Sequence, residues 1–355
     1  MGGLTQEDLA SWQELAGRAA EPNPFFEPAM VLPAWRYVGG SGAVSLLVVR
    51  EGARWLACLP VRRAARFRKV PGPALLAWVH THCFLGTPLV DRDDAVGPLR
   101  ALLAFAGEDP WTGFLALELL GDDGPVGAAL EVALSEEGMR GILYERAERA
   151  ALRRRADAEY LHPDLKPKRR RELQRQRRGL EAELGPISVS NRAGDPRAIE
   201  AFLDLETSGW KGHSGTALAA AGHRLFFGEL CRTLAADSRL QLLALEAGDH
   251  VAAMKCNIVA GDCVFCFKIA RDEALDRFSP GVQLELENVD IFHRTPSASW
   301  TDSCAWEHNQ MINRLWRDRR SVATVLIPGR HALGRTSRYA IRAALGARSL
   351  MRSRT

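Results

Sequence analysis

Lysine is scarce in this chain of 355 residues, and it supplies only six of the 47 basic side chains. Arginine supplies the rest, and the formal net charge is only +4, so any strong positive field depends on where the arginines gather. Aromatic residues are also few, at 7%, and none lies within the basic run at residues 166–178. This argues against sequence-specific reading of nucleic acid.

Long apolar runs are missing as well. No uninterrupted run approaches the roughly 18 residues of a membrane span, and the opening "MGGLTQEDLASWQEL" has neither the basic nor the apolar region of a secretory signal. The seven cysteines are scattered, which favours reduced thiols. We therefore expect a cytoplasmic protein, which could lie peripherally at the inner membrane face through its basic segments.

Cysteine and histidine do not gather in a metal-binding pattern. Cys263 and Cys266 form a CxxC inside "DCVFCFKIA", which is typical of a buried strand, where residues three apart point to opposite faces. His80 and His82, beside Cys83, are expected to share a strand face, but no distant pair completes a site. We expect core residues in both places and no metal.

The chain has a weak internal duplication. "LLVVREGARWLA" (46–57) aligns without a gap with "LLALEAGDHVAA" (242–253), and the two glycines, Gly52 and Gly248, coincide. Each copy predicts two strands joined by a glycine turn, an antiparallel hairpin. A second pair of similar segments, 92–105 and 271–292, follows the first pair in the same order. A tandem pair of similar α/β units is the best account.

Each half is predicted to contain opening helices, a hairpin, a further strand, a helix, and closing strands with a helix between them. In the first half the closing strands are 114–121 and 141–148. Pro163 and Pro167 mark the boundary region. The predicted ranges are an amino-terminal domain (1–155), a carboxy-terminal domain (156–330) and a basic tail (331–355).

A basic helix is predicted from about Lys168 to Leu184, with one narrow apolar stripe of Leu173, Leu180 and Leu184. The basic segment 166–178 is either a solvated face or a site for something anionic: RNA, cofactor phosphates or acidic lipid. The tail is basic and amphipathic too, which favours a membrane-surface or polyanion contact.

The segment "RFSPGVQLELENVDIF" carries the chemistry of an anion site. Ser279 is a favoured N-cap, Pro280 fits the first helical position, and Gly281 would let a ligand approach the backbone. The free N–H groups and positive dipole of such a helix end suit a pyrophosphate. The alternative is an ordinary capped helix.

Acid, base and amide side chains gather after a predicted strand in "SWTDSCAWEHNQMINRLWRDRR" (299–320). Asp302, Glu307 or His308 could serve as a general base for an amine or hydroxyl. The alternative is that Asp302 caps a turn and His308 is a surface residue.

A glycine-rich loop, "SGWKGHSGTAL" (208–218), lacks the glycine spacing and the preceding strand of a nucleotide-binding P-loop. Trp210 could offer a flat apolar face, Lys211 could hold an acceptor carboxylate or phosphate, and Thr216 could cap the next helix. We expect this loop either to bind the acceptor or to serve only as a structural turn with a packed tryptophan.

Four segments, in this order, resemble the GNAT-type acetyltransferases of the CelD/BioF2-like family, relatives of the FemAB aminoacyl transferases. They are "KRRRELQRQRRGLEAELG", "FLDLETSGWKGHSGTAL", "FSPGVQLELE" and "TDSCAWEHNQMINRLW". The resemblance is closest over about 165–330. It implies an α/β mixed-sheet GNAT fold with two tandem GNAT-like domains, the first degenerate and structural.

The resemblance also implies an acyltransferase that uses acetyl-CoA or another acyl-CoA. The donor's pyrophosphate would sit on a loop that departs from the family signature in keeping only one glycine. The implied donor-binding residues are Phe267, Lys268, Ile269, Arg277, Ser279, Pro280, Gly281 and Val282. An acceptor amine or hydroxyl, of cell-envelope or exopolysaccharide metabolism, would attack the acyl carbonyl directly. A backbone N–H between Phe265 and Ile269 would polarise that carbonyl.

Two other hypotheses on the function stay open. One is a FemAB-like aminoacyl transferase that takes its acyl group from aminoacyl-tRNA, which the basic helix would hold. The other is a non-catalytic GNAT-fold accessory protein of polysaccharide synthesis.

Overall fold

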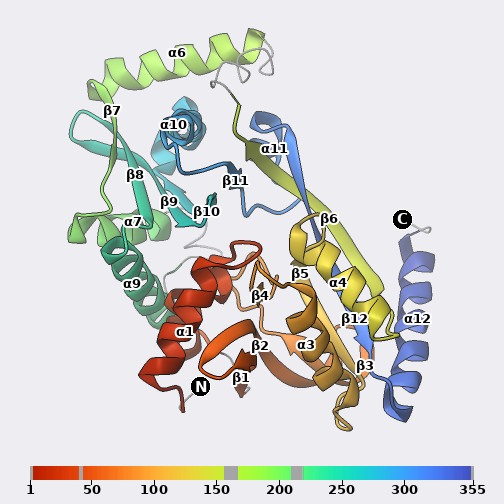
Figure 1. Ribbon diagram of the computed structural model, residues 1–355. Coiled ribbons are helices and arrows are strands. Elements are labelled where there is room, and N and C mark those ends of the chain that lie inside the picture. Colours follow the sequence, from red (N-terminus) through yellow and green to blue (C-terminus); the bar gives the residue numbers. More distant parts are fainter. Residues whose placement is uncertain (1–2, 40–42, 156–166, 209–217, 219, 353–355) are drawn as a thin grey trace. The chain divides into compact units, whose positions relative to one another are not determined.

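The computed structural model describes residues 3–39, 43–155, 167–208, 218 and 220–352 (Figure 1). The chain divides into two compact units. Unit 1 comprises Met1–Trp35, Gly39–Glu148 and Arg320–Thr355, and unit 2 comprises Arg36–Val38 and Arg149–Arg319.

Unit 1 is built on a mixed sheet with the strand order β1-β2-β3-β5-β12-β6, and β4 pairs with β2. Its elements are α1 (Gln6–Gly17), η1 (Pro24–Phe26), most of α2 (Pro28–Tyr37), β1 (Val44–Glu51), β2 (Arg54–Phe67), β3 (Val70–Ala77), β4 (Leu89–Val90), α3 (Val96–Glu108), β5 (Phe114–Gly121), α4 (Pro125–Glu136), the first part of β6 (Ile142–Arg153), most of β12 (Asp318–Pro328) and α12 (Ala332–Arg352).

Unit 2 has the strand order β6-β11-β10-β9-β8-β7, beginning with the last residues of β6. Its other elements are α6 (Pro167–Leu184), β7 (Ile187–Asn191), α7 (Pro196–Ser208), α9 (Ala221–Ala236), β8 (Leu240–Ala247), β9 (His250–Ala260), β10 (Cys263–Arg271), η2 (Glu273–Phe278), α10 (Pro280–Arg294), β11 (Trp300–Asp302) and α11 (Gln310–Leu315).

The two predicted hairpins are confirmed, and they share a detail that the sequence did not reveal. Both two-residue turns begin with a left-handed glycine, Gly52 at φ +59° and Gly248 at φ +56°. In β1–β2 the register shifts between Val49 and Arg50, and in β8–β9 it shifts between Leu245 and Glu246. These positions coincide when the two copies are aligned, so the bulge belongs to the duplicated unit.

Each unit continues the repeat in the same way. After the hairpin comes a third antiparallel strand, then a helix that crosses over to a parallel strand: β3 pairs with β5 in unit 1, and β10 pairs with β11 in unit 2. The closing strands are exchanged between the halves of the chain. β12 pairs with β5 in unit 1, and the end of β6 pairs with β11 in unit 2.

This exchange divides the chain differently from the predicted ranges. The segment from Arg320 onward, which was assigned to the carboxy-terminal domain and a tail, belongs to unit 1. The tail forms α12, and its Ile341, Ala344 and Leu345 pack in a core cluster with Phe67 and Tyr144. The apolar face that favoured a membrane contact is therefore used inside the protein.

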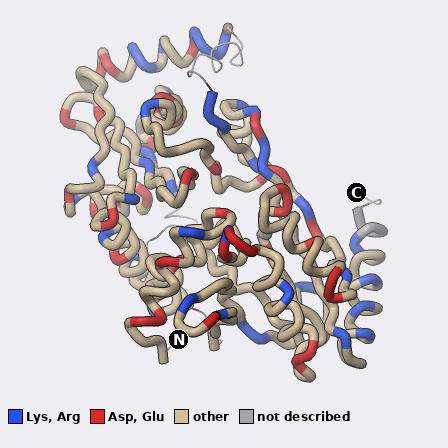
Figure 2. The backbone as a smooth tube through the Cα atoms, in the orientation of Figure 1, with Lys and Arg blue, Asp and Glu red and all other residues tan. Residues whose placement is uncertain are grey.

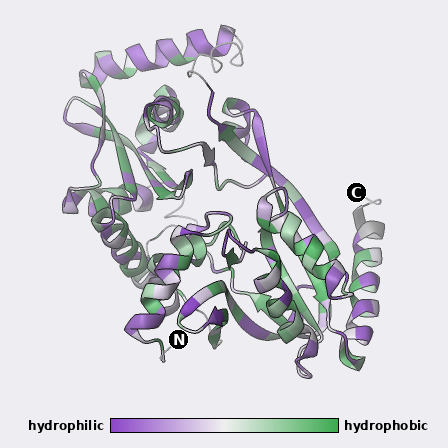
Figure 3. Cartoon of the chain, viewed as in Figure 1, coloured by the Kyte–Doolittle hydropathy of each residue, from purple (hydrophilic) through white to green (hydrophobic). Residues whose placement is uncertain are grey.

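The basic helix is confirmed as α6, Pro167–Leu184. Leu173 and Leu180 are buried, and Leu184 packs against the cluster around Leu180. Most other residues of α6 are hydrophilic, and many of them are basic (Figures 2 and 3). No helix in the described parts of the chain is long and apolar enough to cross a membrane.

The prediction for His80 and His82 was wrong about the strand. β3 ends at Ala77, and the Cys83 N–H closes a turn by donating to the His80 carbonyl at 2.8 Å. All three side chains are buried, as core residues are. Cys263 and Cys266 are buried in β10, as expected.

Candidate active site

Strands β10 and β11 lie parallel in unit 2 and then part. They pair from Cys263↔Trp300 to Phe265↔Asp302, where β11 ends, while β10 continues to Arg271. On its other side β10 stays paired with β9 along its length. The second half of β10 thus presents an edge that β11 does not cover, and backbone amides on such an edge can bind an extended ligand.

A β-bulge sits at the point of parting. Cys266 pairs with Asn257, but the next pair is Lys268 with Cys256, so Phe267 is the extra residue. Phe267 stacks at 6.4 Å on Phe227 of α9. Cys266, in contrast, belongs to a core cluster with Val289 and Phe292 of α10. The bulge therefore re-aims the backbone N–H groups between Phe265 and Ile269, the segment expected to polarise a carbonyl.

Helix α10 begins beside this edge, though its start differs from the prediction. Ser279 occupies the N-cap position in a left-handed conformation (φ +52°), and its side chain makes no capping hydrogen bond. The N–H groups of Val282 and Gln283 donate to the Ser279 carbonyl, at 3.0 and 3.1 Å. Because Pro280 has no N–H, this turn offers an anion at most the Gly281 amide. Ser279 was thus wrongly predicted to cap the helix with its hydroxyl.

Helix α6 packs against the loop before α10, a contact that no spacing in the sequence predicted. A Cβ on Gly179 would lie 2.8 Å from the Phe278 ring, so this glycine permits the close approach. The Gln283 amide donates to the Leu173 carbonyl at 2.8 Å. Arg277 stacks on Phe278 and pairs with Glu183 of α6.

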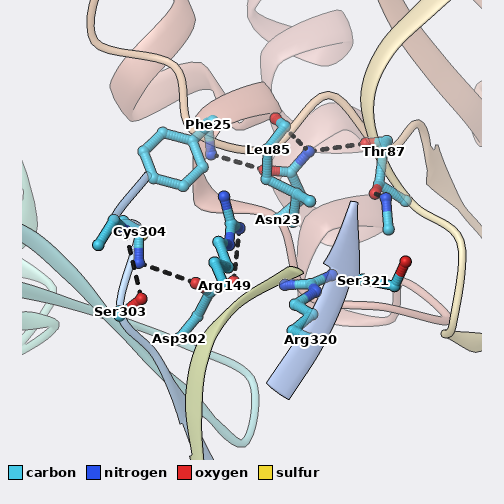
Figure 4. A network of polar contacts seen from close by, with 12 residues as sticks. Asn23, Phe25, Leu85, Thr87, Arg149, Asp302, Ser303, Cys304, Arg320 and Ser321 are labelled. Atoms are coloured by element: carbon cyan, nitrogen blue, oxygen red, sulfur yellow. Dashed lines mark hydrogen bonds and ion pairs between the residues drawn. The ribbon is translucent and has the colours of Figure 1, made fainter. Parts of the chain in front are cut away.

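Asp302 is fully buried at the end of β11. One carboxylate oxygen accepts from Arg149 at 2.6 Å and the other from the Cys304 N–H at 2.9 Å (Figure 4). Arg149 lies on β6 and was not singled out from the sequence, because the predicted strand ended at residue 148; the apolar run "AAL" (150–152) beside it was a usable signal that the strand continues. This geometry resembles that of a structural ion pair more than that of a residue that exchanges protons.

Glu307 and His308 lie beyond Asp302, in the loop before α11. The His308 Nε2 is 3.1 Å from a Glu307 oxygen, and the His308 side chain is 89% exposed. The loop is held by the Asn313 amide, which donates to the Glu307 carbonyl at 2.6 Å, and by the Asn309 side chain, which caps α11. Trp210, Lys211 and Thr216 lie outside the described residues.

A group of buried polar side chains lies between α10 and strand β9. The Lys255 ammonium donates to Glu285 at 2.7 Å, and the Asn288 amide donates to the other Glu285 oxygen at 3.1 Å. The Asn257 amide donates to Asn288 at 2.7 Å. These four side chains were missed, although Lys255 and Asn257 alternate within the apolar strand "AAMKCNIVA" and therefore share a face.

Protonation in this group follows from burial and charge. Burial by itself would lower the pKa of the Lys255 ammonium, but its interactions with Cys266 and with the Glu285 carboxylate outweigh that effect and raise the pKa. Burial raises the pKa of the Cys266 thiol to about 12, against the opposing effect of Lys255. At neutral pH Lys255 is charged and Cys266 is a neutral thiol, which is a poor nucleophile.

Residues 167–290 match the family model of the acetyltransferase (GNAT) domain. The match runs from the start of α6 into α10 and includes β10 with its bulge. Together with the fold, it identifies an acyltransferase domain of the GNAT type, which confirms the predicted fold and class of enzyme.

Several solved structures are similar over most of the chain. The structure titled FemX has a TM-score of 0.60 at 9% identity, covering 90% of this chain and 95% of that one. A protein of unknown function from Bacteroides thetaiotaomicron VPI-5482 has 0.55 at 13%, covering 90% and 97%. The C-terminal DUF2156 domain of a protein described as a lysylphosphatidylglycerol synthetase from Agrobacterium fabrum has 0.53 at 12%, covering 97% and 96%. At these identities the likeness concerns the fold. A search of curated protein sequences gave no match.

Proposed function

We propose that unit 2 transfers an acyl group from acyl-CoA, such as acetyl-CoA, to an amine or hydroxyl of a cell-envelope or exopolysaccharide-related acceptor, in the manner of CelD/BioF2-like proteins. The observation that carries this is the parting of β10 from β11 at a bulge, beside the start of α10. An extended donor arm with amide groups can pair along the open edge of β10, as an added strand would. Its phosphates would then reach the loop from Arg277 to Val282.

The reacting carbonyl would lie at the bulge. An N–H from the segment that includes Phe267, Lys268 and Ile269 would stabilise the negative charge that develops on the carbonyl oxygen. The acceptor would attack this carbon, and the thiolate of the donor would leave. The proton of the acceptor passes to a general base.

Among the three candidate bases, the geometry argues against Asp302. Both oxygens of Asp302 already accept hydrogen bonds, and Arg149 balances its charge. We therefore assign Asp302 to holding β6 and β11 together, and proton acceptance to His308, oriented by Glu307. His308→Ala should then lower turnover at least about 100-fold, the usual scale of general-base catalysis. Full turnover in this variant would remove His308 from the mechanism.

Donor binding is the primary test. Isothermal titration of the full chain with acetyl-CoA, CoA and bulk tRNA should give binding with the two CoA species. Binding of tRNA alone would replace the proposal with aminoacyl transfer from aminoacyl-tRNA. Binding of none of them would overturn both.

The aminoacyl-tRNA candidate is favoured by one specific observation. Lys168, Arg171, Arg175 and Arg178 are exposed and repeat at helical spacing on the side of α6 opposite Leu173 and Leu180. They form a basic stripe on a helix that packs against Arg277 and Phe278, in the loop before α10. Replacing Lys168, Arg171 and Arg178 with alanine should abolish tRNA binding if this candidate holds, and should leave acetyl-CoA binding unchanged if it does not.

A further inference from the structure

The stability of the fold does not explain the buried pair Lys255–Glu285. Both side chains are 5% exposed or less, so each charge has lost its hydration. Two apolar side chains of similar volume would stabilise such a position as well or better. Around the pair, α10 and the sheet already pack through apolar residues such as Leu284, Ala253 and Val289. Charges kept at such a cost are concentrated at functional sites.

The position of the pair points to what it does. Across β9 and β10, Lys255 pairs with Ile269, just beyond the bulge. A Cβ on Gly281 would lie 3.9 Å from Ile269 Cδ1 and 3.5 Å from Arg271 Cδ, so the first turn of α10 lies over these two residues. Glu285 is one helical turn after Gly281. The ion pair therefore ties the sheet to α10 next to the open edge of β10.

An ion pair of this kind fixes a distance, since a charge-assisted hydrogen bond has a narrow range of length and direction. Asn288, which donates to Glu285 and accepts from Asn257, fixes the same helix to the same strand a second time. Apolar contacts alone would hold α10 less specifically, because dispersion has no preferred direction.

We propose that Lys255 and Glu285 are positioning residues of the donor site: they hold the first turn of α10 in register with the bulged edge of β10, so that both ends of an acyl donor are bound at once. This rests on the proposed function. Neither residue needs to touch the donor.

The test compares single and paired substitutions in the full chain. Glu285→Gln leaves a buried ammonium without its charge partner and should lower the Tm by about 5 °C or more. The paired variant Lys255→Met with Glu285→Leu removes both charges and should return the Tm to within about 2 °C of the wild type. Glu285→Asp keeps the charge but shortens the side chain. Glu200→Gln, which removes the exposed pair with Arg224 between α7 and α9, is the control.

Two measurements separate positioning from stability. One is hydrogen exchange, without ligand, in peptides covering 267–271 and 279–285. The other is the Kd for acetyl-CoA by titration. The paired variant and Glu285→Asp should exchange faster in both peptides and bind acetyl-CoA about tenfold more weakly, equivalent to about 1.4 kcal/mol. The control should match the wild type.

The proposal is overturned if the paired variant or Glu285→Asp retains both wild-type exchange and wild-type affinity, because the pair then serves only folding. If the wild-type chain binds no acetyl-CoA, the donor assignment fails, and exchange in the two peptides still decides whether the pair positions α10.

Discussion

The duplicated hairpins allow one prediction to be made with an internal control. Gly52 and Gly248 occupy equivalent turns with nearly the same φ, +59° and +56°. An alanine in this left-handed region costs about 1–2 kcal/mol at either position. Their surroundings differ: a Cβ at position 52 would meet nothing within 4 Å, whereas a Cβ at position 248 would lie 2.1 Å from the Leu184 carbonyl oxygen.

The cost of the second substitution is therefore larger. Leu184 ends α6, so Gly248→Ala must displace the backbone that connects α6 to β7. We expect Gly52→Ala to cost about 1–2 kcal/mol of local stability and Gly248→Ala about 3–4 kcal/mol. Hydrogen exchange in peptides from β1–β2 and β8–β9 measures each hairpin separately, and urea unfolding gives the total.

Equal losses for the two variants would refute this reasoning, since the backbone strain is the same and only the Leu184 contact separates them. Equal losses would mean that the close approach of α6 to the β8–β9 turn is not maintained in solution, and a larger loss for Gly52→Ala would contradict the reasoning as well.

Two further predictions concern helix α12 and the buried thiol of Cys266. Ile341→Ala should destabilise unit 1 by about 2–5 kcal/mol, because the Ile341 side chain is fully buried where α12 packs. The control, Arg342→Ala on the exposed face of α12, should change the free energy of unfolding by less than about 0.5 kcal/mol. Thermal unfolding distinguishes the two variants. Comparable effects would mean that α12 does not pack as described. For Cys266, the folded pKa of about 12 exceeds the ordinary 9.0, so above pH 9 the unfolded chain binds fewer protons than the folded one. The free energy of unfolding should therefore fall as the pH rises from 9 towards 12, by up to about 1.4 kcal/mol per pH unit from this thiol. In urea unfolding, Cys266→Val should make that part of the pH profile flatter. An unchanged slope in this variant would contradict the assignment to Cys266.

Much of the fold could be predicted because the signals are local. Alternating and continuous apolar runs gave β5, β6, β10 and both hairpins, and glycine marked both hairpin turns. The leucine spacing of α6 identified its buried face. The exchange of β6 and β12 could not be predicted, because two closing strands of similar pattern fit either unit and only pairing decides between them.

The candidate site was predicted in outline and missed in its interior. The sequence indicated β10, the start of α10 and the acidic segment after β11, because each carries its signal within a few residues. Arg149 lies 153 positions from Asp302, and Lys255 lies 30 positions from Glu285, so no local pattern joins them.

The sequence by itself determined the elements, the duplication and the type of fold, since periodicity and turn chemistry act over short stretches of chain. Only the tertiary structure decided which carboxylates are held by buried cations, how few amides the start of α10 can offer, and that the basic tail is part of a core. These depend on burial and on pairs brought together from distant positions, where the loss of hydration makes each charge require a partner.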